Sequence, residues 1–239
     1  MKAMVFSDLI MVKRGMAQLF AVTAVVVIVI AVGMETLVVI PAIAAAMIPM
    51  MLLFSVAAYD EMNGWEAFRL GLPLSRSSVV RGRYASLLLV TVAATVFGIV
   101  YALLVALLAA VFADGMGQNT LLASLLLESN PPEIIAASGC MGAAAILLMA
   151  TVTLPLVMRF GMTRATRFVP LVVLFAVVGL VALLGEGGPL ASVVPQGMQW
   201  LMTSDDGFIV LVAGSLGVTL VLYAISAFVS MRLYAAREF

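Results

Sequence analysis

The chain has 239 residues, of which 65% are hydrophobic and 10% are charged, and its 12 basic and 12 acidic side chains leave no net charge. Soluble domains are about 45–50% apolar and about 25% charged, so this composition excludes a soluble fold. The absence of histidine excludes histidine-ligated metal sites and catalytic triads with a histidine base. The composition therefore predicts an all-α, polytopic helical membrane protein with one domain, residues 1–239.

The first 58 residues contain a short amphipathic segment and two apolar runs. Residues 1–15 carry apolar side chains on one side and polar ones, including Asp8, on the other, which predicts a helix lying at the membrane interface. A frayed extension of the first span is the alternative. The runs at 17–34 and 37–58 are each long enough to cross a bilayer, which needs about 20 helical residues. Small residues in the first run predict contact with a second copy of the chain: Ala21, Ala24 and Ala31.

Residues 59–84 form a long connection that includes a predicted amphipathic helix. Its apolar residues recur every three or four positions and predict one helical face: Met62, Trp65, Phe68 and Leu72. Gly71 and Pro73 predict the end of that helix, and Ser75 predicts the N-cap of the next one. Two interpretations remain open, a helix resting on lipid headgroups and a docking helix for a cytosolic partner.

Four further spans are predicted from the apolar runs at 85–112, 134–158, 168–185 and 207–231. The segment between the first two of these runs, 113–133, ends at Pro131 and Pro132. The segment before the last run, 186–206, either dips back into the outer leaflet or lies on the membrane surface.

Basic residues lie only at the two termini and in the connections after the second and fourth runs. Those in the long connection are Arg69, Arg76, Arg81 and Arg83. The other three connections contain only acids. Because cytosolic loops of membrane proteins are enriched in Lys and Arg, both termini and residues 59–84 are predicted to be cytosolic. No charge is expected near the middle of a span, which argues against a proton- or sodium-driven transporter.

A local motif in the long connection contains a carboxylate, then a tryptophan, a Leu-Pro-small-basic step and a basic run that ends in an aromatic residue. The residues are Asp60, Glu61, Trp65, Phe68, Leu72, Pro73, Ser75, Arg76, Val80, Arg83 and Tyr84. This motif resembles the cytosolic loop of type-2 ABC transporter permeases, the small six-span bacterial branch that includes exporters of amphipathic or antimicrobial peptides. The resemblance extends over nearly the whole chain through its length, span number, N-terminal segment and long external segment before the last span.

The resemblance implies a permease subunit that exports an amphipathic or peptide-like substrate from a bacterial cell through the cell membrane. It also implies a partner permease, either a second copy or a paralogue, and cytosolic ABC ATPase subunits that bind ATP and magnesium. The residues that would contact the ATPase are Asp60, Glu61, Met62, Trp65, Phe68 and Leu72. The two lysines, Lys2 and Lys13, lie in no G-x-x-x-x-G-K-[ST] loop, so the chain is not expected to be an enzyme by itself. No cofactor, metal or nucleic acid is expected to bind to it.

Two other functions remain open: the substrate-binding membrane component of an energy-coupling importer, and a membrane sensor or immunity protein that transports nothing. Tyr101 and Tyr223 lie in the middle of predicted spans and are candidates to line a translocation pathway. Their alternative role is packing, with each hydroxyl bonded to a neighbouring helix. The 17 methionines are scattered without nearby Cys or His partners, so they are expected to fill gaps between helices.

Overall fold

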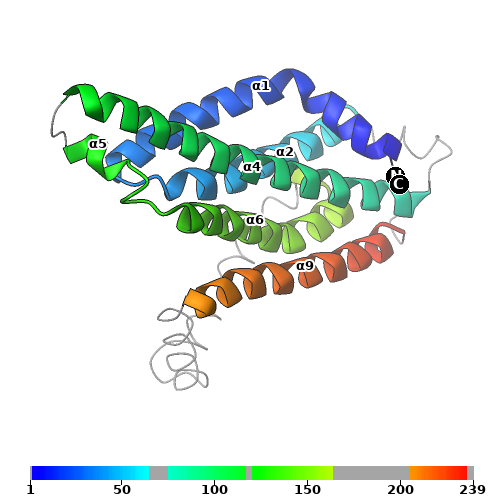
Figure 1. Cartoon of the computed structure of the whole chain (residues 1–239). Helices are drawn as coiled ribbons and strands as arrows, with labels where there is room; N and C mark the ends of the chain where they lie inside the picture. Colours follow the sequence, from blue (N-terminus) through cyan, green and yellow to red (C-terminus); the bar gives the residue numbers. More distant parts are fainter. Residues whose placement is uncertain (1, 65–74, 117–119, 164–204, 236–239) are drawn as a thin grey trace.

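The computed structural model describes residues 2–64, 75–116, 120–163 and 205–235. The helices in these ranges are α1 (Lys2–Gly33), α2 (Val39–Met62), α4 (Arg76–Met116), α5 (Thr120–Ser124), α6 (Pro132–Phe160) and α9 (Asp205–Ala235). All of these helices except α5 are long, and Figure 1 shows the long helices side by side with α5 at one end. Because these ranges contain helices and no strand, the all-α prediction is confirmed for the described part of the chain.

Five of these helices contain segments long and apolar enough to cross a membrane: Gly15–Gly33, Val39–Met62, Arg76–Phe112, Pro132–Phe160 and Gly207–Ala235. They correspond to the first four predicted spans and to the last one. The predicted span at 168–185 lies outside the described residues, as does nearly all of the segment at 186–206. The chain is therefore a multi-pass membrane protein, and a total of six spans stays a prediction.

Three helix boundaries differ from the prediction. The predicted interfacial helix at 1–15 is continuous with the first span in α1, which bends along its length (Figure 1). Helix α2 continues past the predicted end at 58 as far as Met62. Helix α4 begins at Arg76 and has 41 residues, which gives it a length of about 60 Å. Since the hydrocarbon core of a bilayer is about 30 Å thick, α4 extends beyond the core or crosses it at a steep tilt.

Two predicted helix starts agree with the structure. The Ser75 hydroxyl accepts a hydrogen bond from the backbone N–H of Ser78 at 3.3 Å, which is the geometry of an N-cap. Helix α6 begins at Pro132 with Pro131 as its N-cap residue, as expected because proline is favoured in the first turn of a helix. Both connections therefore end at the residues that the sequence indicates.

Helix α2 packs between α1, α4 and α6. A Cβ atom added at Gly142 of α6 would lie 2.4 Å from the Ala42 carbonyl oxygen, and one added at Gly98 of α4 would lie 2.7 Å from Pro41 Cα. Small residues let helix backbones approach this closely. Helix α9 packs against α6 and α4 at the edge of the bundle (Figure 1).

The two ends of the bundle differ in charge. We call one the basic end; its described arginine side chains are those of Arg76, Arg81, Arg83, Arg159 and Arg232. We call the other the acidic end; its described acids with placed side chains are Glu35, Glu128 and Glu133. Helices α6 and α9 pack together and run in the same direction, from the acidic end to the basic end (Figure 1). The end of α6 and the start of α9 therefore lie at opposite ends of the bundle.

One buried amide organises the connections at the acidic end. Asn130, which is 1% exposed, accepts hydrogen bonds through Oδ1 from the Thr36 hydroxyl and the Leu37 N–H, both at 2.9 Å. Its Nδ2 donates to the carbonyl oxygens of Ser124 at 2.8 Å and Leu126 at 3.0 Å. Asn130 thus joins the turn between α1 and α2 to the connection between α5 and α6.

Candidate functional site

The predicted contact with an ATPase begins on the last turn of α2. Asp60 is buried there, whereas Met62 has 82% of its surface exposed and Glu61 is also exposed. These three residues belong to α2. The prediction instead places Asp60 and Glu61 in the loop and Met62 at the start of a separate loop helix. The other predicted contact residues, Trp65, Phe68 and Leu72, and the predicted cytosolic Arg69 lie outside the described residues, and their roles stay predictions.

Helix α2 ends in a glycine turn. The backbone N–H of Asn63 donates to the Tyr59 carbonyl oxygen at 3.2 Å, and the Asn63 side chain donates to the same oxygen at 2.9 Å. Gly64 follows with a φ of 61°, a left-handed conformation that glycine adopts without steric cost. Helix stops are predicted at Gly71 and Pro73 and not at Gly64, although a glycine just after a helix is a common C-terminal signal.

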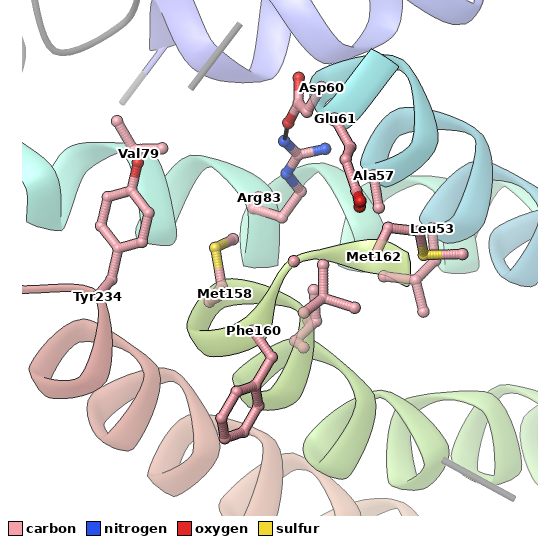
Figure 2. Close-up of a pocket in the computed structure, with 13 residues that line it drawn as sticks. Leu53, Ala57, Asp60, Glu61, Val79, Arg83, Met158, Phe160, Met162 and Tyr234 are labelled. Carbon is pink, nitrogen blue, oxygen red and sulfur yellow. Dashed lines mark hydrogen bonds and ion pairs between the residues drawn. The ribbon is translucent and has the colours of Figure 1, made fainter. Parts of the chain in front are cut away.

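A buried ion cluster joins the start of α4 to α1 and α2. Arg83 donates through Nη2 to Asp60 Oδ2, and the two side chains point toward each other in Figure 2. On the α1 side, Arg83 Nε lies 3.7 Å from Asp8 Oδ2. The Ser86 hydroxyl, about one turn further along α4, donates to the same Asp8 oxygen at 3.0 Å. We call Asp8, Asp60, Arg83 and Ser86 the ion cluster.

The ion cluster is almost completely removed from solvent. Arg83 is 7% exposed, Asp60 6% and Asp8 0%. Transfer of an ion from water into a protein interior costs several kcal/mol, and removal of one partner of a buried pair leaves that cost uncompensated. The attraction between Arg83 and its carboxylates therefore holds α1, α2 and α4 in one arrangement at the basic end.

Glu61 links the same turn of α2 to the chain that follows α6. Its carboxylate accepts hydrogen bonds from the Thr163 backbone N–H at 2.8 Å and from the Thr163 hydroxyl. Asp60 and Glu61 are consecutive, and they connect α2 to α4 and to the segment after α6 respectively. The last turn of α2 is thus attached to two neighbours by polar contacts.

A cavity of about 130 Å³ lies between these groups. Asp60, Glu61 and Arg83 form its polar wall, and apolar side chains of α2, α4 and α6 form most of the remainder (Figure 2). Nε and Nη1 of Arg83 are buried and donate no hydrogen bond to a described residue. The cavity is polar on one side and large enough for several water molecules, which would satisfy such groups.

Hydroxyl groups attach α9 to α4 close to the ion cluster. The Tyr84 hydroxyl lies 2.8 Å from Ser226 Oγ and 2.7 Å from Ser230 Oγ. The Tyr223 hydroxyl donates to the Tyr84 carbonyl oxygen at 2.9 Å, and the two tyrosine rings lie 4.8 Å apart. Tyr223 is buried, and its hydroxyl is bonded to a neighbouring helix; the pathway-lining role of Tyr223 stays a prediction.

Tyr101 makes the equivalent contact on α1. Its hydroxyl donates to the Ala24 carbonyl oxygen at 3.2 Å, and its ring stacks on Phe97 with the ring centres 5.8 Å apart.

Ala31 lies in the core of the chain with no exposed surface. Its predicted place in a contact with a second copy is therefore wrong, because its own chain covers it, whereas Ala21 is exposed.

The predicted basic segment has two other described arginines, Arg76 and Arg81, and their environments differ from that of Arg83. Arg81 is exposed and donates to Ser77 of its own helix at 3.1 and 3.3 Å. Arg76 is also exposed and donates to the Ala235 carbonyl oxygen at 2.7 Å, where it stabilises the C-terminal end of α9. The three arginines look alike in the sequence, and no sequence pattern marks Asp8 or Ser86 as a partner of Arg83.

Comparisons with known proteins agree with this architecture. A family model described as "ABC-2 family transporter protein" matches residues 3–235. No curated protein and no solved structure matches the chain. In the described part of the chain, no group of three or more His, Cys, Asp or Glu side chains is arranged to hold a metal ion. Since the family model covers nearly the whole chain, the chain belongs to the ABC-2 transporter family and is a membrane permease component of an ABC transporter.

Proposed function

We propose that this permease exports an amphipathic or peptide-like substrate, powered by separate cytosolic ABC ATPase subunits that bind ATP and magnesium. The ATPase would press on the connection between α2 and α4, through the predicted apolar face of Trp65, Phe68 and Leu72. The basic end would face the cytosol because cytosolic loops are rich in Lys and Arg. A bacterial cell membrane with both termini cytosolic is part of the same proposal.

The observation that carries the proposal is the ion pair between Asp60 and Arg83. The connection from Asn63 to Ser75 leaves the end of α2 and returns at the start of α4, and this buried pair joins the two helices just inside both points. A push on the connection would therefore move α2 and α4 together rather than bend one of them. Movement of packed helices as units is a common element of transport and allosteric transitions.

The same contacts would spread the movement to the other described helices. Asp8 couples α1 to the ion pair, and Glu61 couples α2 to Thr163 after α6. Tyr84, next to Arg83, would carry the movement to α9 through its bonds to Ser226 and Ser230. Helix ends that were merely joined by a connection would not require polar links to so many neighbours.

The coupling proposal is tested by aromatic truncation in the connection. Trp65→Ala and Phe68→Ala are expected to lower copurification of the ATPase and to uncouple ATP hydrolysis from transport in reconstituted vesicles, because a central aromatic anchor contributes about 2 kcal/mol or more to an interface. Trp200→Ala, the same change at the other tryptophan of the chain, is the matched control and should keep both activities. Full copurification and full transport in both connection variants would contradict the proposal.

We further propose that two permease chains line one pathway. Helix α1 exposes Val25 and Val29 over 60% of their surfaces, whereas Val27 is fully buried in its own chain. The exposed face offers a contact surface for a second copy. Val25→Cys should then form a cross-linked dimer in membranes, and Val27→Cys should not. Absence of any dimer in native membranes, with the ATPase still bound, would contradict pairing through α1.

A further inference from the structure

The acidic end has an open groove of about 660 Å³ beside the outer part of α4. Ligand pockets commonly measure about 300–1,000 Å³. Apolar side chains from α4 and from the connection before α6 line the groove: Leu103, Ala106, Leu107, Ala110, Val111, Leu126 and Leu127. Glu128 is the one charged residue among the described residues that line it.

The groove opens on a face of α4 that no described helix covers. Leu107 is 60% exposed and Val111 is 63% exposed, and both continue a row of exposed apolar residues along α4 that includes Val96 and Val100. This row lies within the candidate membrane span Arg76–Phe112. An apolar face of a spanning helix is covered by acyl chains in a bilayer, and no described helix separates the groove from them.

Glu128 lines the groove at the acidic end, outside the candidate spans. It is exposed and precedes α6, whose first turn carries Glu133. The three connections at the acidic end contain no Lys or Arg anywhere in the sequence. An anionic headgroup would therefore meet like charge at this position, whereas an ammonium group could pair with the Glu128 carboxylate.

We propose that the groove binds one phospholipid with a primary-amine headgroup, from the leaflet at the acidic end. The acyl chain lies along Leu103, Leu107 and Val111, and the ammonium group contacts Glu128. Apolar walls with one acid at the rim match a molecule that has an apolar chain and a cationic end. The site is independent of the transported substrate and of ATPase coupling.

The experiment uses the full chain in detergent with equal amounts of phosphatidylethanolamine and phosphatidylglycerol that carry identical acyl chains. The protein is purified again, and the retained lipid is quantified by mass spectrometry. We expect the wild-type protein to retain more phosphatidylethanolamine than phosphatidylglycerol. Glu128→Gln should reduce that preference about fivefold, as expected for loss of one charge at the membrane surface. Glu133→Gln is the matched control and should leave the preference unchanged.

A second pair of variants tests the groove itself. Leu107→Trp fills the groove and should displace the retained lipid, whereas Leu104→Trp, at an exposed residue of α4 outside the lining, should not. Equal retention of the two lipids by the wild-type protein would overturn the proposal. So would an unchanged preference in Glu128→Gln, or a groove that takes a cationic amphipathic peptide and excludes phosphatidylethanolamine.

Discussion

Arg83 and Arg81 show how the surroundings of a residue change the role of the same side chain. Both belong to one basic run in the sequence, yet Arg83 is 7% exposed and pairs with Asp60 and Asp8, whereas Arg81 is exposed and donates hydrogen bonds to Ser77 of its own helix. The two positions are two residues apart on one helix, about 200° around its axis. One therefore faces the bundle and the other faces away from it.

This difference predicts a large stability effect at one position and a small one at the other. Arg83→Gln and Asp60→Asn should each lower the free energy of unfolding by about 3–5 kcal/mol, because each leaves a buried charge without its partner. The variant with both changes should lose less free energy of unfolding than the sum of the two single losses. Arg81→Gln should change stability by about 0.5 kcal/mol or less. Thermal unfolding in detergent measures all four, and simple additivity of the two single changes would contradict direct coupling.

The glycines of the helices make a second comparison at the residue scale. A Cβ added at Gly142 would lie 2.4 Å from the Ala42 carbonyl oxygen, whereas one added at Gly214 of α9 would have no atom within 4 Å. Gly142→Ala should therefore force α6 away from α2 and destabilise the protein by about 1–3 kcal/mol. Gly214→Ala should be neutral or slightly stabilising, since alanine has the higher helix propensity. Equal melting temperatures of the two variants would show that α2 and α6 are not closely packed.

At the scale of elements, span positions follow from the sequence but some helix ends do not. The apolar runs predict the five described spans because a crossing helix must be apolar over about 20 residues. Helix α2 continues past the predicted end at residue 58. Asp60 is charged and therefore looks like a loop residue in the sequence, but in the structure it pairs with Arg83, 23 residues later. Asp8 and Arg83 are 75 positions apart in the sequence, and no local pattern indicates such a pair. The candidate site is thus predictable in its location and not in its contacts.

Asn130 provides a test of how the connections at the acidic end are held. It accepts two hydrogen bonds from the turn between α1 and α2 and donates two to the connection before α6. Asn130→Ala should cost about 1–3 kcal/mol, because the buried Leu37 N–H loses its partner. Hydrogen exchange at residues 35–38 should also rise. Ser129→Ala, at an exposed neighbour, should change neither measurement, and protection that is unchanged in Asn130→Ala would contradict the role assigned to Asn130.

At the scale of the whole molecule, helix directions constrain the number of crossings. Helices α6 and α9 run in the same direction, so the chain leaves α6 at the basic end and enters α9 at the acidic end. A chain that ends on one side of a membrane and resumes on the other must cross it an odd number of times. One crossing at 168–185, where the apolar run lies, would bring the total to six. Both termini would then be on the same side, as the charge distribution predicts.

Cysteine labelling in intact cells tests this topology. Cys140 is first replaced by alanine, and single cysteines are introduced at Glu35, Ser75 and Ser204. An impermeant maleimide should label positions 35 and 204 from outside, and position 75 should react only after permeabilisation, because the basic end faces the cytosol. A cysteine at Thr163 should behave like the one at position 75. If positions 163 and 204 reacted from the same side, an even number of crossings would separate them and the six-span topology would be wrong. Labelling of 75 from outside, with 35 protected, would instead reverse the orientation and place the predicted ATPase contact on the wrong side of the membrane.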